Sequence, residues 1–305
     1  MRILITGGAG FIGSHLSTEL INAGHHIVIV DNLSTGKAGN IPQKAVFYQE
    51  DIVDGKRIEE IFNRERPEIV YHLAAQTSVP FSMEKPEDDA RVNIMGSINV
   101  LNACVSSKAG KFIFTSSAAV YGKPENLPVN ENHPIRPLSG YGISKHTVEH
   151  YTELFAENYG IKYIIFRCAN VYGEKQERDG EAGVVSVFMD ALIKDKLMYI
   201  HGDGEQTRDF IYVRDVVTAA LQAIDNGENG IINISTGLGI TVNKLITVME
   251  NASRKTARVE KIEPRSGDIK NSVLSNQLAC RLLGWKPAFS LEDGLLNMWR
   301  HQPDK

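Results

Sequence analysis

The sequence has few of the features that mark metal-binding, secreted or membrane proteins. Its three cysteines, Cys104, Cys168 and Cys280, lie far apart and share no metal-ligand spacing. Scattered thiols are typical of a reducing compartment, and they predict no metal site. No run approaches the about 20 apolar residues of a membrane span, and the apolar first residues lead directly into a glycine-rich turn, unlike a signal peptide. We therefore expect a cytoplasmic protein without a membrane partner.

The sequence also lacks a strong charge of either sign. The net charge is −4, and the 305 residues are 42% hydrophobic and 23% charged. This charge argues against a nucleic-acid-binding surface, and the composition is ordinary for a globular protein. The length suits one large domain or two interlocked domains.

A glycine-rich turn lies near the N-terminus. Residues 2–6 are rich in β-branched side chains and predict a strand, and apolar residues at helical spacing predict a helix over 12–22. Gly7, Gly10 and Gly13 lie between or at the start of these elements. The three glycines permit a tight turn, the close approach of a pyrophosphate and close helix packing, in that order. This pattern predicts a dinucleotide site.

The end of the second predicted strand indicates which dinucleotide binds. Asp31 directly follows the predicted strand over 26–30. A carboxylate in this place accepts hydrogen bonds from the adenosine ribose hydroxyls and repels a 2′-phosphate. We therefore predict NAD as the cofactor rather than NADP.

Strands and helices alternate through the first half of the chain. The predicted strands span 2–6, 26–30, 46–49, 69–73, 111–116 and 162–167, and the predicted helices 12–22, 57–64, 87–106 and 140–158. Such alternation predicts an α/β fold with a Rossmann-type, doubly wound parallel sheet and a ligand at the carboxyl ends of the strands. We expect 1–170 to form the dinucleotide-binding domain, 209–235 to return to it, and 171–305 to form mainly a smaller, interleaved substrate-binding lobe.

Two sets of polar side chains indicate the chemistry. Tyr141 and Lys145 lie four residues apart in a predicted helix, so they share one face. A free tyrosine has a pKa of about 10, and we expect Lys145 and the positive nicotinamide ring to favour the phenolate, which then takes a proton from an alcohol. Ser116 and Ser117 end the fifth predicted strand, and we favour the Ser117 hydroxyl as the group that contacts both the substrate and Tyr141.

Eight segments in this order resemble the extended short-chain dehydrogenase/reductase family. They are TGGAGFIGSH, DNLS, HLAAQ, the asparagine of RVNIMG, FTSSAAVYG, YGISK, FRCANVYG and GDGEQTRDFIYV. Within the family the chain is most similar to the nucleotide-sugar 4-epimerases of the UDP-galactose 4-epimerase kind. The resemblance implies an isomerase that uses NAD and acts on a UDP-sugar or dTDP-sugar, and it implies a homodimer through the helices near 87–106 and 140–158.

The resemblance also implies a set of binding residues. Expected to contact NAD, besides the three glycines, Tyr141 and Lys145, are Phe11, Ile12, Asp31, Asn32, Leu33, Ser34, Thr35, Gly36, Asp51, Ile52, Leu73, Ala74, Ala75, Gln76, Thr77, Asn93, Ser116 and Ala169. Expected to contact the nucleotide-sugar, besides Ser117 and Tyr141, are Asn170, Val184, Val185, Tyr199, Arg208, Arg265, Asp268 and Ser272. Arginine suits phosphate because its guanidinium makes forked contacts.

The two residues after the strand end indicate which reaction of the family this chain catalyses. Related 4,6-dehydratases place an acidic pair just after the serine or threonine at the strand end, and related decarboxylases a glutamate. This chain has Ala118 and Ala119 there, and alanine transfers no proton. We therefore favour a 4-epimerase that passes through a transient 4-keto sugar. The alternatives are another enzyme of the family (4,6-dehydratase, decarboxylase or 4-reductase) and a non-catalytic NAD-binding regulator.

The identity of the sugar and of the base is open. Alignment of GDIKNSVLSNQLACRLLGW on the family pattern puts Ser272 where a bulky residue closes the pocket beside the sugar C2 substituent. A small side chain there leaves room for an N-acetyl group, so UDP-N-acetyl sugars join UDP-glucose and UDP-galactose as candidates. The family often has an asparagine in the helix over 184–193, where this chain reads VVSVF, so the base is either uracil or thymine.

Overall fold

A parallel sheet of seven strands forms the centre of the larger lobe in the computed structural model, which describes residues 1–176, 183–264 and 269–301. The strand order is β11-β6-β5-β4-β1-β2-β3, and each neighbouring pair is parallel. The prediction of a Rossmann-type, doubly wound sheet is confirmed. The strands are β1 (Arg2–Thr6), β2 (His26–Val30), β3 (Val46–Tyr48), β4 (Ile69–His72), β5 (Lys111–Ser117), β6 (Lys162–Cys168) and β11 (Gly230–Ile234).

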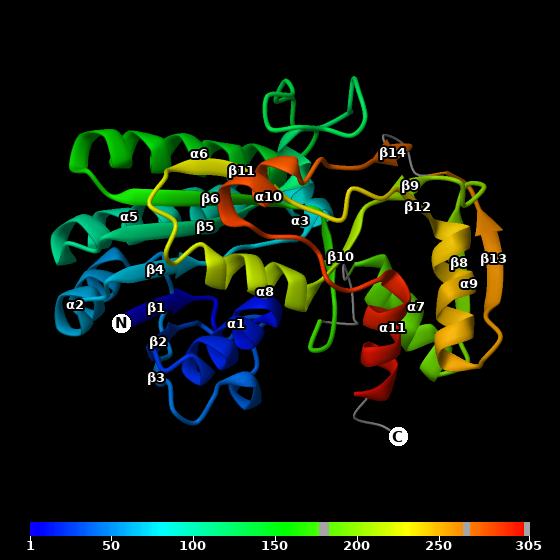
Figure 1. Cartoon of the computed structure of the whole chain (residues 1–305), viewed down its shortest axis with the longest axis horizontal. Coiled ribbons are helices and arrows are strands. Elements are labelled where there is room, and N and C mark those ends of the chain that lie inside the picture. The colour runs from blue at the N-terminus through cyan, green and yellow to red at the C-terminus, as the bar shows by residue number, and fades with distance from the viewer. Residues whose placement is uncertain (177–182, 265–268, 302–305) are drawn as a thin grey trace.

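Helices cover both faces of this sheet (Figure 1). Side chains alternate along a strand, so Ile3 and Ile5 of β1 pack with α1 (Phe11–Asn22) and α8 (Val213–Gln222). Leu4 points to the opposite face. That face is covered by α2 (Gly55–Glu65), α5 (Gly96–Ser107) and α6 (Gly140–Tyr159). Both faces of every central strand are therefore buried, which explains their continuous apolar sequences.

The predicted helix over 87–106 is present and contains a π-helical turn. It consists of α4 (Pro86–Ala90), a π-helical turn (Arg91–Met95) and α5. The wide turn carries Asn93, whose side chain is buried and hydrogen-bonded to Gln76. A further helix, α3 (Val79–Glu84), precedes them and was not predicted; Ser78 caps its N-terminus by accepting from the Phe81 N–H.

The smaller lobe has a separate apolar core on α7 (Val184–Ile193), α9 (Val242–Ser253) and α11 (Leu291–Arg300). Its strands are short: β7 (Asn170–Tyr172), β8 (Leu197–His201), β9 (Thr207–Arg208), β10 (Phe210–Tyr212), β12 (Ile240–Thr241), β13 (Arg258–Ile262) and β14 (Asn271–Ser272). Two 3₁₀ turns, Ala38–Asn40 and Ala118–Val120, and α10 (Gln277–Leu283) complete the chain.

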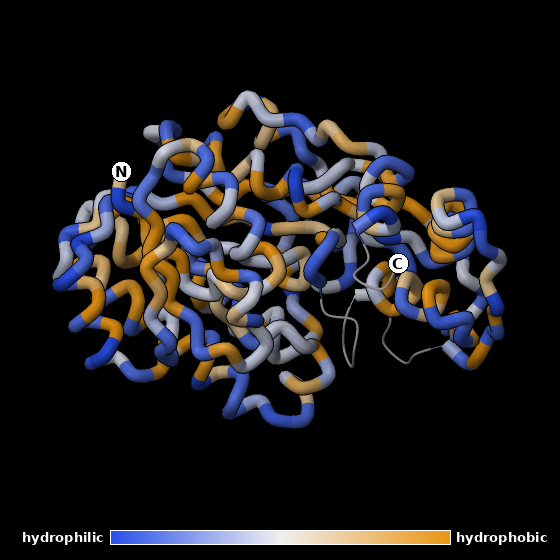
Figure 2. The backbone as a smooth tube through the Cα atoms, turned by 90° about the horizontal axis from the view of Figure 1, so that it is seen from below, coloured by the Kyte–Doolittle hydropathy of each residue, from blue (hydrophilic) through white to orange (hydrophobic). Residues whose placement is uncertain are grey.

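The lobes are interleaved in sequence. The chain enters the smaller lobe after β6 and returns to the large sheet at β11, which pairs with β6. Figure 2 shows hydrophobic segments running through the interior and hydrophilic segments along the outer turns. Within the described residues, no helix is long and apolar enough to cross a membrane.

A buried histidine ties two central strands to the loop that follows β4. His72 is fully buried, and its ring nitrogens lie 2.7 Å from the Thr6 hydroxyl and 2.8 Å from the Ser97 hydroxyl. The Thr6 hydroxyl also accepts a hydrogen bond from the Ala74 N–H. Burial, with the positive charge of Lys145, lowers the pKa of His72 to about 3. The native protein therefore holds His72 neutral.

Acid should destabilise the protein partly through His72. The unfolded chain binds a proton at this histidine below pH about 6.5, whereas the native state does not until about pH 3. The free energy of unfolding should thus fall by about 1.4 kcal/mol per pH unit from this group between those pH values. Urea unfolding at several pH values between 7 and 4.5 measures the slope. His72→Gln should reduce it, and equal slopes in the two proteins would contradict the assignment.

Candidate active site

A large cavity of about 2010 Å³ lies between the two lobes. Its walls come from the carboxyl ends of the sheet strands, from the loop and helix after β4, and from the smaller lobe. Sites for a single small ligand usually measure 300–1,000 Å³. The cavity therefore has room for a dinucleotide and a second ligand side by side, at the place where an open α/β sheet binds ligands.

Most of the predicted site residues line this cavity. They are Gly7, Gly10, Phe11, Ile12, Gly13, Asp31, Asn32, Leu33, Ser34, Thr35, Gly36, Asp51, Ile52, Leu73, Ala74, Ala75, Gln76, Thr77, Ser116, Ser117, Tyr141, Lys145, Ala169, Asn170, Val184, Val185, Arg208 and Ser272. Residues from distant parts of the sequence thus meet in one hollow.

Four predicted residues do not join the described wall. Asn93 lies behind the wall. Its side-chain amide accepts from the Gln76 N–H and donates to the Gln76 carbonyl. Tyr199 is 52% exposed on β8, since its neighbours Met198 and Ile200 take the buried side of the strand. Neither Asn93 nor Tyr199 is among the described lining residues, and their contacts to ligands stay a prediction. Arg265 and Asp268 lie outside the described residues.

The glycine-rich turn forms a cradle that only glycine can complete. Gly7 has φ +71°, and a Cβ atom there would lie 2.6 Å from the Ala74 nitrogen. A Cβ on Gly13 would lie 2.2 Å from the Gly7 carbonyl oxygen, so α1 sits directly on the turn. Gly10 is the N-cap of α1 and makes no side-chain cap hydrogen bond. The positive end of the α1 dipole thus borders the cavity, as a pyrophosphate requires.

Asp31 holds the far side of the same turn. One of its carboxylate oxygens accepts from the Ala9 N–H at 2.9 Å, and the other from the Leu33 N–H at 2.8 Å. The carboxylate lines the cavity and is buried, so it is fixed in position beside the glycine-rich turn. Each oxygen keeps a further lone pair, and these can accept from two ribose hydroxyls. Cradle and carboxylate together fit NAD.

Ser117, Tyr141 and Lys145 meet at the carboxyl end of β5. The Ser117 side chain hydrogen-bonds to the Tyr141 hydroxyl, and the Lys145 ammonium lies 5.8 Å from the centre of the Tyr141 ring. Ser139 caps α6 by accepting from the Gly142 N–H, which fixes the turn that carries Tyr141. The arrangement places a phenol, a hydroxyl and a cation on one patch of wall.

Burial decides the protonation of Tyr141 in the protein without cofactor. Burial raises the pKa of Tyr141 to about 12, and the hydrogen bond from Ser117 offsets only part of that rise. The Lys145 ammonium donates to the Thr115 carbonyl at 2.9 Å. Burial also lowers the pKa of Lys145 to about 8. At neutral pH the protein alone therefore presents a neutral phenol and a charged lysine.

The opposite wall carries the predicted contacts to the second ligand. The short strands β9 and β14 pair in parallel, and their register sets Ser272 beside Arg208. Asn170 begins β7, and its N–H donates to the Asp209 carbonyl. The Asp209 carboxylate is buried and accepts from the Thr236 and Gly237 N–H groups, so the segment between Arg208 and Phe210 is firmly held. Arg208 lines this wall and supplies it with a positive charge.

The structure adds wall residues that the sequence did not predict. Val79, Phe81 and Met83 of α3 line the cavity next to the Tyr141 side, and Lys175 and Gln176 line it from the smaller lobe. The serine cap and proline at the start of SVPFSMEKP are a helix-start pattern that would have predicted α3. Directly after β5, Ala118 and Ala119 both line the cavity.

Known proteins are similar to this chain in sequence and in architecture. Residues 3–235 match the NAD dependent epimerase/dehydratase family. A protein of Methanocaldococcus jannaschii described as a putative UDP-glucose 4-epimerase is 45% identical, over 96% of this chain and 95% of its own.

Solved structures agree over nearly the whole chain. The Thermotoga maritima UDP-glucose 4-epimerase with UDP-glucose superposes with a TM-score of 0.96 at 44% identity, covering 99% of this chain and 98% of its own. The Thermus thermophilus UDP-glucose 4-epimerase in complex with NAD gives a TM-score of 0.93 at 38% identity, with the same coverage.

Proposed function

Because the chain belongs to the NAD dependent epimerase/dehydratase family, we propose that it is a nucleotide-sugar 4-epimerase that interconverts UDP-glucose and UDP-galactose. One observation carries the choice of reaction. Ser117 and Tyr141 share the cavity wall with two alanines, Ala118 and Ala119, at the place where elimination enzymes need an acid and a base. This wall moves a proton at one hydroxyl and offers no second proton-transfer group directly after β5.

The residues that hold NAD are those of the cradle and the strand ends. The turn from Gly7 to Gly13 and the start of α1 would bind the pyrophosphate, and Asp31 the adenosine ribose. Bound NAD would supply the reversible acceptor for the hydride of the sugar C4. The nicotinamide end would lie toward Tyr141 and Lys145, since the cradle and these residues border one cavity.

The proton is handled by Tyr141. The phenolic oxygen receives a proton from the sugar 4-hydroxyl in one half of the cycle and gives it back in the other. A group that does both must be able to gain and lose the proton, so the high pKa of Tyr141 in the protein alone has to fall in the loaded site. Lys145 supplies a positive charge, and the Ser117 hydroxyl donates to the phenolic oxygen and stabilises the phenolate.

Nuclear magnetic resonance spectra test the proposal. Purified protein is incubated with a panel of UDP-sugars and dTDP-sugars without added NAD, and the product is identified. We expect conversion between 4-epimers from cofactor that stays bound. A dehydratase would give a 4-keto-6-deoxy sugar, and a 4-reductase or dehydrogenase would change the nicotinamide absorbance in proportion to the substrate. A non-catalytic regulator would convert none of the panel.

Ser272 is proposed to set access for the sugar C2 substituent. It lies on the wall beside Arg208, and its short side chain leaves room that a tyrosine would fill. Ser272→Tyr should lower kcat/KM for UDP-N-acetylglucosamine by at least about tenfold and change that for UDP-glucose much less. Initial rates of epimerisation of each sugar, measured with the wild type and the variant, give the two kcat/KM values. Full retained activity on the N-acetylated sugar would contradict a role for Ser272.

A homodimer in the cytoplasm is also proposed. Apolar side chains of α6 and of the turn before α5 are exposed, namely Met95 at 53%, Ile143 at 53%, Leu154 at 49% and Tyr159 at 59%. A second copy would cover such a surface. The three cysteines are free thiols, two of them buried, which suits a reducing compartment.

A further inference from the structure

Glu149 lies one helical turn beyond Lys145 on α6, with its carboxylate buried behind the candidate active site. We propose that Glu149 is a positioning residue of this site: it holds the carboxyl end of β5 and keeps Lys145 positively charged. The inference rests on the proposed function for its catalytic consequence. Its structural and electrostatic content is independent of which sugar reacts.

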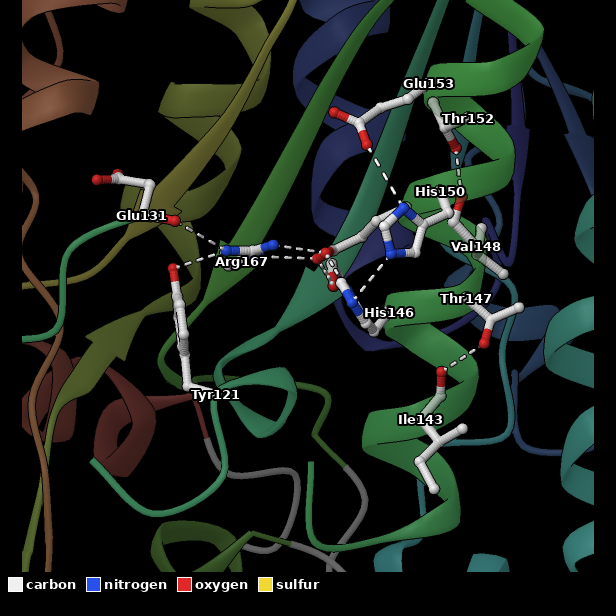
Figure 3. A network of polar contacts seen from close by, with 12 residues as sticks. Tyr121, Glu131, Ile143, His146, Thr147, Val148, His150, Thr152, Glu153 and Arg167 are labelled. Carbon is white, nitrogen blue, oxygen red and sulfur yellow. Dashed lines mark hydrogen bonds and ion pairs between the residues drawn. The ribbon is translucent and has the colours of Figure 1, made fainter. Parts of the chain in front are cut away.

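Four donors surround the Glu149 carboxylate. Oε1 accepts from the Ser116 hydroxyl at 2.6 Å and from Nε of Arg167 at 2.9 Å. Oε2 accepts from the terminal nitrogen of Arg167 at 2.6 Å and lies 3.0 Å from Nδ1 of His146. Figure 3 shows the guanidinium of Arg167 held between Tyr121 and α6. A carboxylate with this many charge-assisted bonds has one fixed position.

The bond to Ser116 links this carboxylate to the reacting groups. Ser116 lies between Thr115, whose carbonyl accepts from the Lys145 ammonium, and Ser117, which hydrogen-bonds to Tyr141. Lys145 and Glu149 thus hydrogen-bond to neighbouring residues of β5 from the same face of α6.

Few anions act on the buried Lys145. Cys168 of β6, Asp89 of α4 and Glu149 each raise the pKa of Lys145 against the effect of burial. The Cys168 thiol stays neutral, because burial raises its pKa to about 12. His72 of β4 also faces Lys145 and is neutral as well. The carboxylates of Asp89 and Glu149 are therefore the anions that favour a charged Lys145 at neutral pH.

Replacing Glu149 with glutamine removes the negative charge and keeps the size of the side chain. Glu149→Gln keeps an oxygen for Ser116 but leaves the Arg167 charge unopposed near Lys145, so the field on Lys145 becomes more positive. A unit charge about 6 Å away at an effective dielectric of about 20 shifts a pKa by one to two units. We expect the Lys145 titration midpoint to fall by about one pH unit. The double variant Glu149→Gln, Arg167→Met removes both charges and should recover more than half of that shift.

The experiment is a titration of Lys145 in the NAD-loaded protein. Lysine labelled with ¹³C at Cε reports each ammonium by its chemical shift, and Lys145→Met identifies the signal. Glu153→Gln is the matched control: Glu153 lies one turn further along α6, is 43% exposed, and has two weak partners, His150 at 3.8 Å and the Tyr163 hydroxyl at 3.4 Å. It should leave the midpoint unchanged. An unchanged midpoint in Glu149→Gln overturns the proposal.

Epimerase rates provide the second measurement. A midpoint lowered by one unit should reduce kcat about eightfold at pH 8.5 and less than twofold at pH 6.5. A role confined to folding would instead lower kcat by the same factor at both pH values, in the double variant too, and would overturn the proposal.

Should the wild-type protein epimerise no sugar, the proposed function fails while the titration still decides the inference. Should Glu149→Gln not fold, because Arg167 is left buried and unpaired, the double variant carries the test: its midpoint must lie less than half a pH unit below that of the wild type, and a larger fall overturns the proposal.

Discussion

Replacing Tyr141 with phenylalanine is expected to lower kcat by about 10²–10⁴-fold, the range for a lost general acid–base group. The change removes one oxygen atom and keeps the ring that lies 5.8 Å from the Lys145 ammonium. Without the phenolic oxygen, the neighbouring hydroxyl at the end of β5 is that of Ser117, which is far too weak a base to take the 4-hydroxyl proton. KM should change little, since the phenyl ring still fills its place.

The comparison uses Tyr159→Phe, which makes the same change at the exposed end of the same helix. That variant should match the wild type in rate. Both proteins should carry the wild-type amount of NAD, measured by absorbance after denaturation. A Tyr141→Phe protein with more than about one tenth of the wild-type kcat would show that another group takes the proton.

Replacing Gly13 with alanine is expected to weaken NAD binding by up to about 100-fold. The new methyl group would lie 2.2 Å from the Gly7 carbonyl oxygen and 2.8 Å from the Gly8 Cα, both of them backbone atoms that cannot rotate away. Helix α1 must therefore move off the turn. Relieving such a clash costs about 1–3 kcal/mol, and the first turn of α1 no longer points its N–H groups at the pyrophosphate.

The matched control is Gly227→Ala, where an added Cβ meets no atom within 4 Å and the φ angle is ordinary. Isothermal titration of NAD into protein freed of cofactor gives the affinity of each variant. Gly13→Ala should lose affinity and Gly227→Ala should not. Unchanged NAD affinity in Gly13→Ala would mean that the cradle does not bind the dinucleotide.

Local pattern predicted the main sheet because each of its strands is a continuous apolar run followed by small or polar residues. β1, β2 and β6 were predicted to within a residue for this reason. The two-residue strands β9 and β14 of the smaller lobe were not predicted, because they exist only through pairing with segments distant in the sequence. The exposure of Tyr199 was not predictable for the same reason: its direction depends on β8, whose partner β13 lies about 60 residues later in the chain.

The candidate site was predictable where one motif fixes the geometry, as in the turn from Gly7 to Gly13. It was not predictable where burial decides the chemistry. The spacing of Tyr141 and Lys145 gave their shared helix face, but it could not show that burial would raise the pKa of Tyr141 to about 12. Nor could it show that the Lys145 ammonium would bond to the Thr115 carbonyl, which belongs to a strand 30 residues away.

A deuterium label tests the central claim, a closed cycle in which the hydride leaves C4 and returns to the same carbon. UDP-glucose carrying deuterium at C4 is incubated in ordinary water with the protein and its retained NAD, and the product is examined by nuclear magnetic resonance. The account predicts UDP-galactose with the deuterium still at C4 and no accumulation of NADH at 340 nm. Product that carries ordinary hydrogen at C4, or NADH formed in proportion to the substrate consumed, would contradict it.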